Sequence, residues 1–127
     1  MKKDIKEVPK VWGKELWIAN SEMYCGKKLV LKKGYRCSIH HHKKKDETFF
    51  VQSGKVLMEF GPDTDTKQIL NEGDSVHLPP NLWHRFTGLE NSEIFEFSTQ
   101  HFEDDSFRKE ESGRINLADL ELPPEER

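Results

Sequence analysis

The sequence predicts an all-β fold, either a sandwich or a small barrel of many short strands. Apolar residues alternate with polar ones over short segments, as in strands with one buried face. Turn residues interrupt these segments, and no apolar stretch keeps a helical period for longer than about two turns. The 127 residues include eight Phe and three Trp, which supply bulky apolar side chains for one compact core.

We expect one domain over residues 1–127, with a barrel over about 7–100 and a C-terminal extension over about 101–127. The alternating segments predict strands at Glu7–Val11, Gly13–Asn20, Tyr24–Leu31, Tyr35–His42, Glu47–Ser53, Lys55–Phe60, Lys67–Leu70, Asp74–Leu78, His84–Thr87 and Ser92–Ser98. The turns between strands are expected at Lys33-Gly34, Ser53-Gly54, Gly61-Pro62-Asp63, Asn71-Glu72-Gly73 and Pro79-Pro80-Asn81. In the extension, a helical turn around Asn116–Leu120 would pack Leu117 and Leu120. The acidic end beyond Pro123 is expected to fray.

Strict alternation along a strand also predicts which side chains face the interior. The same parity places Lys27 inside, where an ammonium group needs a partner. Glu96 alternates with Phe95 and Phe97, so it lies either on the surface or in a polar cavity. The apolar and small residues expected to point inward are Leu29, Leu31, Ser38, Phe49, Val51 and Phe86.

The charge and composition exclude several classes of function. The formal net charge of −3 gives no indication of nucleic-acid binding, so we expect no nucleic-acid partner. No apolar run approaches the length of a membrane span, and the N-terminus lacks the apolar region of a secretion signal. The two cysteines, Cys25 and Cys37, match no zinc-ribbon or redox spacing. We therefore expect a reduced, cytoplasmic protein without a membrane partner.

Three histidines and a glutamate form the strongest chemical pattern in the chain. His40 and His42 share one face of an extended strand, with His41 on the other. Glu47 begins the next apolar run, and His84 offers a fourth donor farther along. Such imidazole and carboxylate groups can hold a transition metal and leave other coordination positions open. The alternative is a basic loop or the remnant of an engineered tag, but tags usually lie at a terminus and this histidine run is internal.

The spacing of these residues resembles the two sequence motifs of the cupin superfamily. Gly34, His40, His42, Glu47 and Gly54 match the first motif throughout. Gly73, Pro79 and His84 match the second motif. Asn81 stands where that motif has a glycine, and the motif's asparagine three residues after the histidine is absent. The resemblance implies a small antiparallel double-stranded barrel, with metal ligands at His40, His42, Glu47 and His84.

A finer resemblance is to the cupin part of type II mannose-6-phosphate isomerases and to cupin-type D-lyxose isomerases. Val11-Trp12-Gly13 resembles their opening, and the lysine-led segment from Lys27 to Gly34 resembles the strand before their metal motif. Ile94-Phe95-Glu96 and Glu103-Asp104-Asp105 resemble their closing segments. In these enzymes a lysine two residues before the metal glutamate and a glutamate on the late strand are implicated in proton transfer. The matching residues here are Lys45 and Glu96.

The resemblance implies a metal-dependent aldose–ketose isomerase that acts on a mannose- or lyxose-like sugar or sugar phosphate. Proton transfer between two carbons needs an acid and a base, and a metal would stabilise the enediolate. Glu96 would serve as the base if burial raises its pKa toward neutral. Lys45 would serve as the acid, or stabilise the enediolate oxygen, with its pKa lowered by the nearby cation. The expected substrate-binding residues are Lys27 and Arg85 as anchors, and Ser38 and Trp83 at the pocket mouth.

Two other functions remain open from the sequence. One is another cupin reaction, such as that of an iron-dependent dioxygenase, and the other is a non-catalytic sugar-binding module of carbohydrate or nucleotide-sugar metabolism. The three histidines and Glu47 are expected to bind one divalent transition metal, and the sequence does not distinguish among Mn, Zn, Fe, Co and Ni. Arg85 alternates with His84 and therefore could instead pair with an acid on the outer face of the barrel. Because an open barrel leaves an edge strand, we expect a homodimer.

Overall fold

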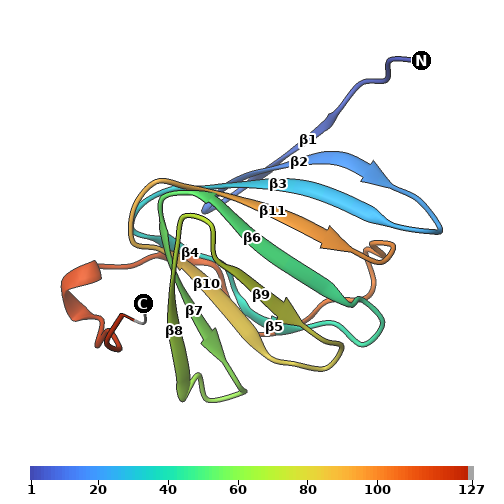
Figure 1. Cartoon of the computed structure of the whole chain (residues 1–127). Helices are drawn as coiled ribbons and strands as arrows, with labels where there is room; N and C mark the ends of the chain where they lie inside the picture. The colour runs from blue at the N-terminus through green and yellow to red at the C-terminus, as the bar shows by residue number, and fades with distance from the viewer. Residues whose placement is uncertain (126–127) are drawn as a thin grey trace.

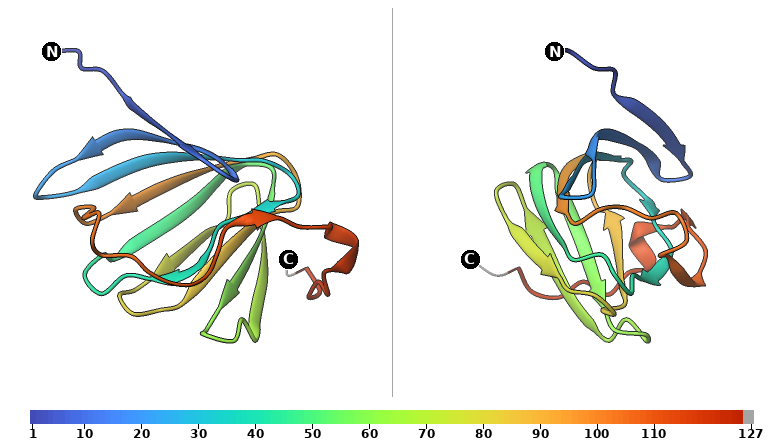
Figure 2. Two further views of the ribbon diagram at one scale, coloured as in Figure 1. Left: turned by 180° about the vertical axis from the view of Figure 1, so that it is seen from behind. Right: turned by 90° about the vertical axis from the view of Figure 1, so that its right-hand side faces the viewer.

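The computed structural model describes residues 1–125, and its regular structure is almost entirely antiparallel strand. A six-stranded sheet has the order β1-β2-β3-β11-β6-β9. A seven-stranded sheet runs β12-β5-β10-β4-β13, with β7 paired to β10 and to β8. The two sheets lie across from each other and enclose the interior (Figure 1), while the first residues project away from them in all the views (Figure 2). This arrangement confirms the predicted all-β barrel.

The strands of the six-stranded sheet are β1 Lys6–Lys10, β2 Gly13–Asn20, β3 Cys25–Leu31, β6 Glu47–Ser53, β9 Ser75–Leu78 and β11 Ser92–Ser98. Those of the seven-stranded sheet are β4 Tyr35–Arg36, β5 Ile39–His41, β7 Lys55–Phe60, β8 Thr66–Asn71, β10 His84–Gly88, β12 Phe107–Glu110 and β13 Gly113–Arg114. The bounds of β2, β6, β7 and β11 are those predicted from the alternation of the sequence.

Two features differ from the predicted strands by more than one residue at a strand end. The expected strand Tyr35–His42 is divided into β4 and β5, because Cys37 and Ser38 leave the regular ladder between them. Cys37 donates its backbone N–H to Phe86 O at 3.2 Å and accepts from Arg85 Nε at 3.0 Å. The short strands β12 and β13 were not expected, and they pair the C-terminal extension with β5 and β4.

Among the residues described, no helix has the length and apolar character to cross a membrane.

The core lies between the sheets and includes the apolar residues that alternation predicted to point inward. Phe49 and Phe86 pack at 6.0 Å between ring centroids, and Trp12 meets Phe86 edge-on at 5.0 Å. A second, smaller cluster lies elsewhere and includes Leu57 and Ile69. The short 3₁₀ helix η1, Leu117–Asp119, follows the N-cap Asn116, and both Leu117 and Leu120 pack against this second cluster. The expected helical turn is therefore confirmed.

Candidate metal centre

Three histidines from the edge of the cavity converge on one point. His40 lies in β5, His42 follows that strand directly, and His84 opens β10 directly opposite His40 in the ladder. Their ligand nitrogens all lie within 4.8 Å of one another. The ring centroids are 4.4 Å apart for His40 and His84 and 5.1 Å apart for His40 and His42. The three side chains are therefore positioned to bind a metal ion.

The hydrogen bonds of the three rings leave one nitrogen of each available. In each ring Nδ1 lies against a backbone carbonyl, which can only accept, so Nδ1 carries the proton and Nε2 keeps its lone pair. This fixed tautomer and orientation are typical of metal-binding histidines. Burial is the largest factor that lowers the pKa of all three rings, that of His84 to about 4, so the rings are neutral at pH 7. The Nδ1 atoms donate from His40 to Ser38 O at 2.9 Å, from His42 to Asp105 O at 2.8 Å and from His84 to Leu82 O at 3.0 Å.

Glu47 brings a carboxylate to the same point. It begins β6, is 2% exposed, and places Oε2 3.4 Å from His42 Nε2 and 3.5 Å from His84 Nε2. Glu47 Oε2 and His84 Nε2 are buried and have no hydrogen-bond partner within residues 1–125. Burial, and then the charge of Glu96, raise the pKa of Glu47 well above its usual range. A buried carboxylate oxygen and a buried nitrogen lone pair without partners are costly, and a cation between them would satisfy both, so these residues fit a metal ion.

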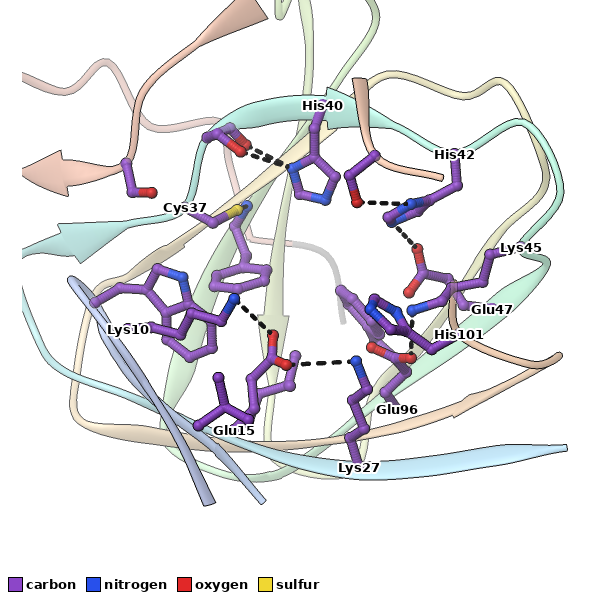
Figure 3. Close-up of a pocket in the computed structure, with 18 of the residues that line it drawn as sticks. Lys10, Glu15, Lys27, Cys37, His40, His42, Lys45, Glu47, Glu96 and His101 are labelled. Atoms are coloured by element: carbon purple, nitrogen blue, oxygen red, sulfur yellow. Dashed lines mark hydrogen bonds and ion pairs between the residues drawn. The ribbon is translucent and has the colours of Figure 1, made fainter. Parts of the chain in front are cut away.

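A cavity of about 150 Å³ adjoins the histidines and is lined by polar side chains from several strands (Figure 3). Lys45 and Glu96 form a buried ion pair in its wall, with Lys45 Nζ 3.0 Å from Glu96 Oε2. Ser98 Oγ donates to the same carboxylate oxygen at 2.8 Å. The two groups are 3% and 4% exposed as residues. Glu96 therefore points into the polar cavity, which decides the choice that the sequence left open.

The pKa shifts of this ion pair run opposite to those expected from the sequence. Burial alone would raise the pKa of Glu96, but Lys45, Lys27 and the hydrogen bonds from Lys45 and Ser98 outweigh it and hold the pKa at about 2. Burial alone would lower the pKa of Lys45, but the carboxylates of Glu96 and Glu47 raise it. Both groups are therefore charged at neutral pH, because each provides the other with a counter-charge that water cannot.

Lys27 and Ser38 also line the cavity, as the sequence predicted. Lys27 is 2% exposed, lies 3.3 Å from Glu15 Oε1 and stands over the Trp17 ring at 4.2 Å from its centroid. This carboxylate and ring are the partners that a buried ammonium needs. Ser38 Oγ lies 3.2 Å from His40 Nδ1, beside the metal-binding rings.

Trp83 and Arg85 do not reach the lining of the cavity. Both flank His84 in sequence and point to the other side of the sheet. Trp83 packs edge-on against His41 at 4.3 Å between ring centroids. Arg85 is buried, donates from Nε to Cys37 O at 3.0 Å and lies 3.8 Å from Glu110. The structure therefore does not bring these two residues to the other candidate site residues, and the outer-face pairing that parity suggested for Arg85 is the one observed.

Among the site residues that the sequence did not predict, two lie in the loop between β11 and β12. The Asp105 carboxylate accepts hydrogen bonds from the backbone N–H groups of Lys43, Lys44 and Lys45 at 3.0–3.2 Å. These bonds hold the turn that aims Lys45 inward and leave its two neighbours exposed. His101 lines the cavity from the same loop. In the sequence, this loop was indicated only by the resemblance of the acidic segment at 103–105 to the related isomerases, and that resemblance assigned no function to a single residue.

Solved structures with the same architecture include CapF, KdgF and oxalate decarboxylase. CapF, the capsular polysaccharide assembling protein of Staphylococcus aureus, aligns with a TM-score of 0.73 and 18% identity over 86% of this chain and 35% of its own. KdgF from Halomonas sp. aligns at 0.69 and 19% over 80% of this chain and 90% of its own. Oxalate decarboxylase from Bacillus subtilis aligns at 0.69 and 21% over 83% of this chain and 30% of its own.

These likenesses are below 25% identity and indicate a shared fold. The chain spans about a third of CapF and of oxalate decarboxylase, and most of KdgF. No curated protein sequence matches the chain. Residues 28–97, which contain both histidine motifs and more than half of the 127 residues, match the cupin domain family. With this match, the barrel and the three converging histidines, the chain belongs to the cupin family.

Proposed function

We propose that this protein is a metal-dependent aldose–ketose isomerase that acts on a mannose- or lyxose-like sugar or sugar phosphate. The observation that carries this proposal is the buried Lys45–Glu96 ion pair in the wall of the cavity that adjoins the three histidines. An isomerase needs a base and an acid within reach of one substrate, next to a group that stabilises negative charge on oxygen. Glu96, Lys45 and a metal held by the histidines would fill these three roles.

His40, His42, Glu47 and His84 would hold one divalent cation, and nitrogen and oxygen donors of this kind accept Mn, Zn, Fe, Co or Ni. When bound, such a cation polarises a substrate carbonyl and stabilises negative charge on the substrate oxygens. The protein contributes neutral imidazoles that are already oriented by their carbonyl partners. The side chains of His42, Glu47 and His84 are themselves buried, which limits the access of water.

Glu96 and Lys45 would move the proton between C1 and C2. Glu96 is ionised at neutral pH, so its carboxylate is ready to accept the C2 proton and return it to C1. Its low pKa depends on Lys45, and a Lys45 ammonium that turns to a substrate oxygen would remove part of that counter-charge. The carboxylate would then become more basic at the stage when the substrate is bound. Lys27 and Ser38 would contact substrate hydroxyls from the same wall.

The solved structures support a small-molecule role without specifying it. CapF is described as a polysaccharide assembling protein, and oxalate decarboxylase acts on a small carboxylic acid. Both extend well beyond the length of this chain. KdgF aligns over 90% of its own length, so the shared barrel makes up most of that protein.

The proposal extends to assembly and location. β1 and β9 are the edge strands of the six-stranded sheet, and the projecting N-terminal residues precede β1. Because an uncovered edge strand can pair with another chain, we propose a homodimer that covers one of these edges. Light scattering coupled to gel filtration measures this directly, and a monomer at micromolar concentration contradicts it. Cys25 and Cys37 are both free thiols, which supports a reducing, cytoplasmic location.

The experiment that tests the isomerase proposal is incubation of the purified protein with manganese and a panel of aldoses and their phosphates in deuterated water. Aldose–ketose interconversion supports the proposal when solvent deuterium appears at C1 of the ketose or at C2 of the aldose re-formed from it. Oxygen consumption with ferrous iron and no interconversion would instead indicate a dioxygenase. Sugar binding without either reaction would indicate a binding module. A Lys45→Ala or Glu96→Gln variant that keeps the full isomerase rate would remove the proton-transfer assignment.

A further inference from the structure

His101 occupies a built position in the cavity that the proposed reaction does not use. Its backbone N–H donates to Asn20 Oδ1 at 2.8 Å, and Asn20 Nδ2 donates to His101 O at 3.2 Å. Its ring packs edge-on against Trp17 with 4.9 Å between centroids. The side chain is 13% exposed. A loop residue held by two backbone bonds and a ring contact has a defined orientation, so this imidazole belongs to the wall of the cavity.

The His101 ring lies near both ion pairs that line the cavity (Figure 3). One pair is Lys45–Glu96 and the other is Lys27–Glu15. Burial is the main cause that lowers the pKa of His101 to about 4, and the charges of Lys45 and Lys27 lower it further. The imidazole is therefore neutral at pH 7, with one nitrogen that donates a hydrogen bond and one that accepts.

The hydrogen-bonding capacity of this ring is mostly unused. Nδ1 of His101 is buried, and no described residue forms a hydrogen bond with it. The other nitrogen, Nε2, lies 3.9 Å from a carboxylate oxygen of Glu103, whose side chain is 82% exposed, so this contact is too long for a hydrogen bond. A buried polar atom without a partner costs roughly 1–3 kcal/mol, so the ring gains free energy from any group that enters the cavity and bonds to it.

The charges around His101 define what that group is. Lys27 and Glu15 neutralise each other at 3.3 Å, and Lys45 and Glu96 do so at 3.0 Å. Glu15 Oε1 also accepts from Trp17 Nε1 at 2.8 Å, which fixes the carboxylate. The partly exposed Lys10 lies 4.0 Å from the other oxygen of Glu15. The charged groups in the buried part of this cavity wall are therefore paired with one another, and they still offer hydrogen-bond donors and acceptors. Hydroxyl groups, which both donate and accept, match it better than an anionic group does.

We propose that His101 is a ligand-contacting residue that hydrogen-bonds a hydroxyl group of a neutral, polyhydroxylated molecule, with the Lys27–Glu15 pair completing the same subsite. The inference rests on the proposed function only in its choice of ligand class, because the subsite is defined by residues outside the metal-binding set. It assigns to His101 a role in holding the carbon chain of the ligand, separate from metal binding and from proton transfer.

The test is the affinity of the metal-loaded protein for D-mannitol, a neutral sugar alcohol that has no carbonyl and cannot be isomerised. His101→Phe keeps an aromatic ring for Trp17 and the backbone bonds to Asn20, but removes both ring nitrogens. We expect it to raise the dissociation constant about three- to tenfold, the range for loss of one hydrogen bond between neutral groups. His101→Gln, which retains a donor and an acceptor, should recover part of the affinity.

His77→Phe is the matched control, because His77 is exposed and lies outside the cavity lining. Its affinity for D-mannitol should equal that of the unaltered protein, and all variants should retain the same metal content. An unchanged dissociation constant in His101→Phe, or the absence of D-mannitol binding to the unaltered protein, overturns the subsite. Sugar alcohol binding without isomerase turnover overturns the proposed reaction and leaves the subsite standing, so the two failures are distinguishable.

Discussion

Replacement of Glu96 by Gln tests whether the buried ion pair is the main electrostatic support of the cavity wall. The variant keeps the size of the side chain and its bond from Ser98, but leaves the ammonium of Lys45 without its nearest counter-charge. Lys45 is 3% exposed, so water cannot replace the lost carboxylate. Removal of one partner from a buried pair typically costs about 3–5 kcal/mol, because an uncompensated charge remains inside.

The pKa of Glu96 gives an independent magnitude. It falls from the ordinary 4.5 to about 2 in the folded protein. Since a tenfold change in proton affinity is about 1.4 kcal/mol, this corresponds to stabilisation on the order of 3 kcal/mol. Because the folded-state pKa is depressed, this stability is present above pH 4.5 and is lost as the pH falls toward about 2.

Glu47 affects the pH dependence of folding stability in the opposite direction to Glu96. Burial and the charge of Glu96 raise its pKa, so its contribution is present below the usual pKa of a glutamate and is lost as the pH rises through the raised value. Neutralising Glu96 relieves part of this repulsion, which places the expected loss for Glu96→Gln near the lower figure of about 3 kcal/mol.

The assay is urea unfolding at pH 7, followed by circular dichroism, with a chelator present. Glu93→Gln is the matched control, because Glu93 lies on the same strand and pairs with Lys28 on a partly exposed face, where such a pair contributes about 1 kcal/mol or less. The double variant Lys45→Met with Glu96→Gln should recover much of the loss, because no buried charge is left alone. Equal losses for Glu96→Gln and Glu93→Gln, or strictly additive single losses, would refute the reasoning.

Three further predictions concern the metal, the loop and one turn. His84→Ala removes one of three converging nitrogens and should abolish stoichiometric metal binding in elemental analysis, and retention of one metal per chain would contradict the site. Asp105→Ala leaves three backbone N–H groups without an acceptor and should weaken metal affinity about 10- to 100-fold in a chelator competition; unchanged affinity would show that the turn holds itself. Gly54→Ala should destabilise the fold by more than about 1 kcal/mol in urea, because the added Cβ at φ +91° would lie 2.5 Å from Asn91 O. Gly73→Ala, also at positive φ but in open space, should cost less, and equal losses would exclude the steric cause.

The strands were predictable where one face of each is buried. Phe49 and Val51 in β6, and Leu29 and Leu31 in β3, alternate with exposed or half-buried residues, so both the strands and their inward faces follow from the sequence. β12 contains no buried residue, and it is held by backbone bonds to β5. A strand that buries no side chain leaves no periodic pattern in the sequence, which is why the C-terminal pairing was not predicted.

The convergence of the histidines was predictable for the same reason, because strand parity sets the direction of each side chain once the fold is known. Parity also indicated that Arg85 faces away from His84, and its choice as a substrate anchor was therefore the weakest of the expected assignments. The charge states of Lys45 and Glu96 were not predictable, because each depends on the distance between two residues that are 51 positions apart. If burial is considered for each residue separately, the direction of the pKa shift comes out wrong for both Lys45 and Glu96.

The loop between β11 and β12 joins the separate parts of the site. Asp105 orients His42 through its backbone carbonyl and, through its carboxylate, the turn that carries Lys45, while His101 in the same loop faces the cavity. None of these contacts has a periodic signal, since each connects the loop to a residue about 60 or 80 positions away. The metal ligand, the ion pair and the proposed hydroxyl subsite therefore share one support. A change that displaces this loop should alter metal affinity, Lys45 and ligand binding together, whereas a change confined to the His101 ring should alter ligand binding alone.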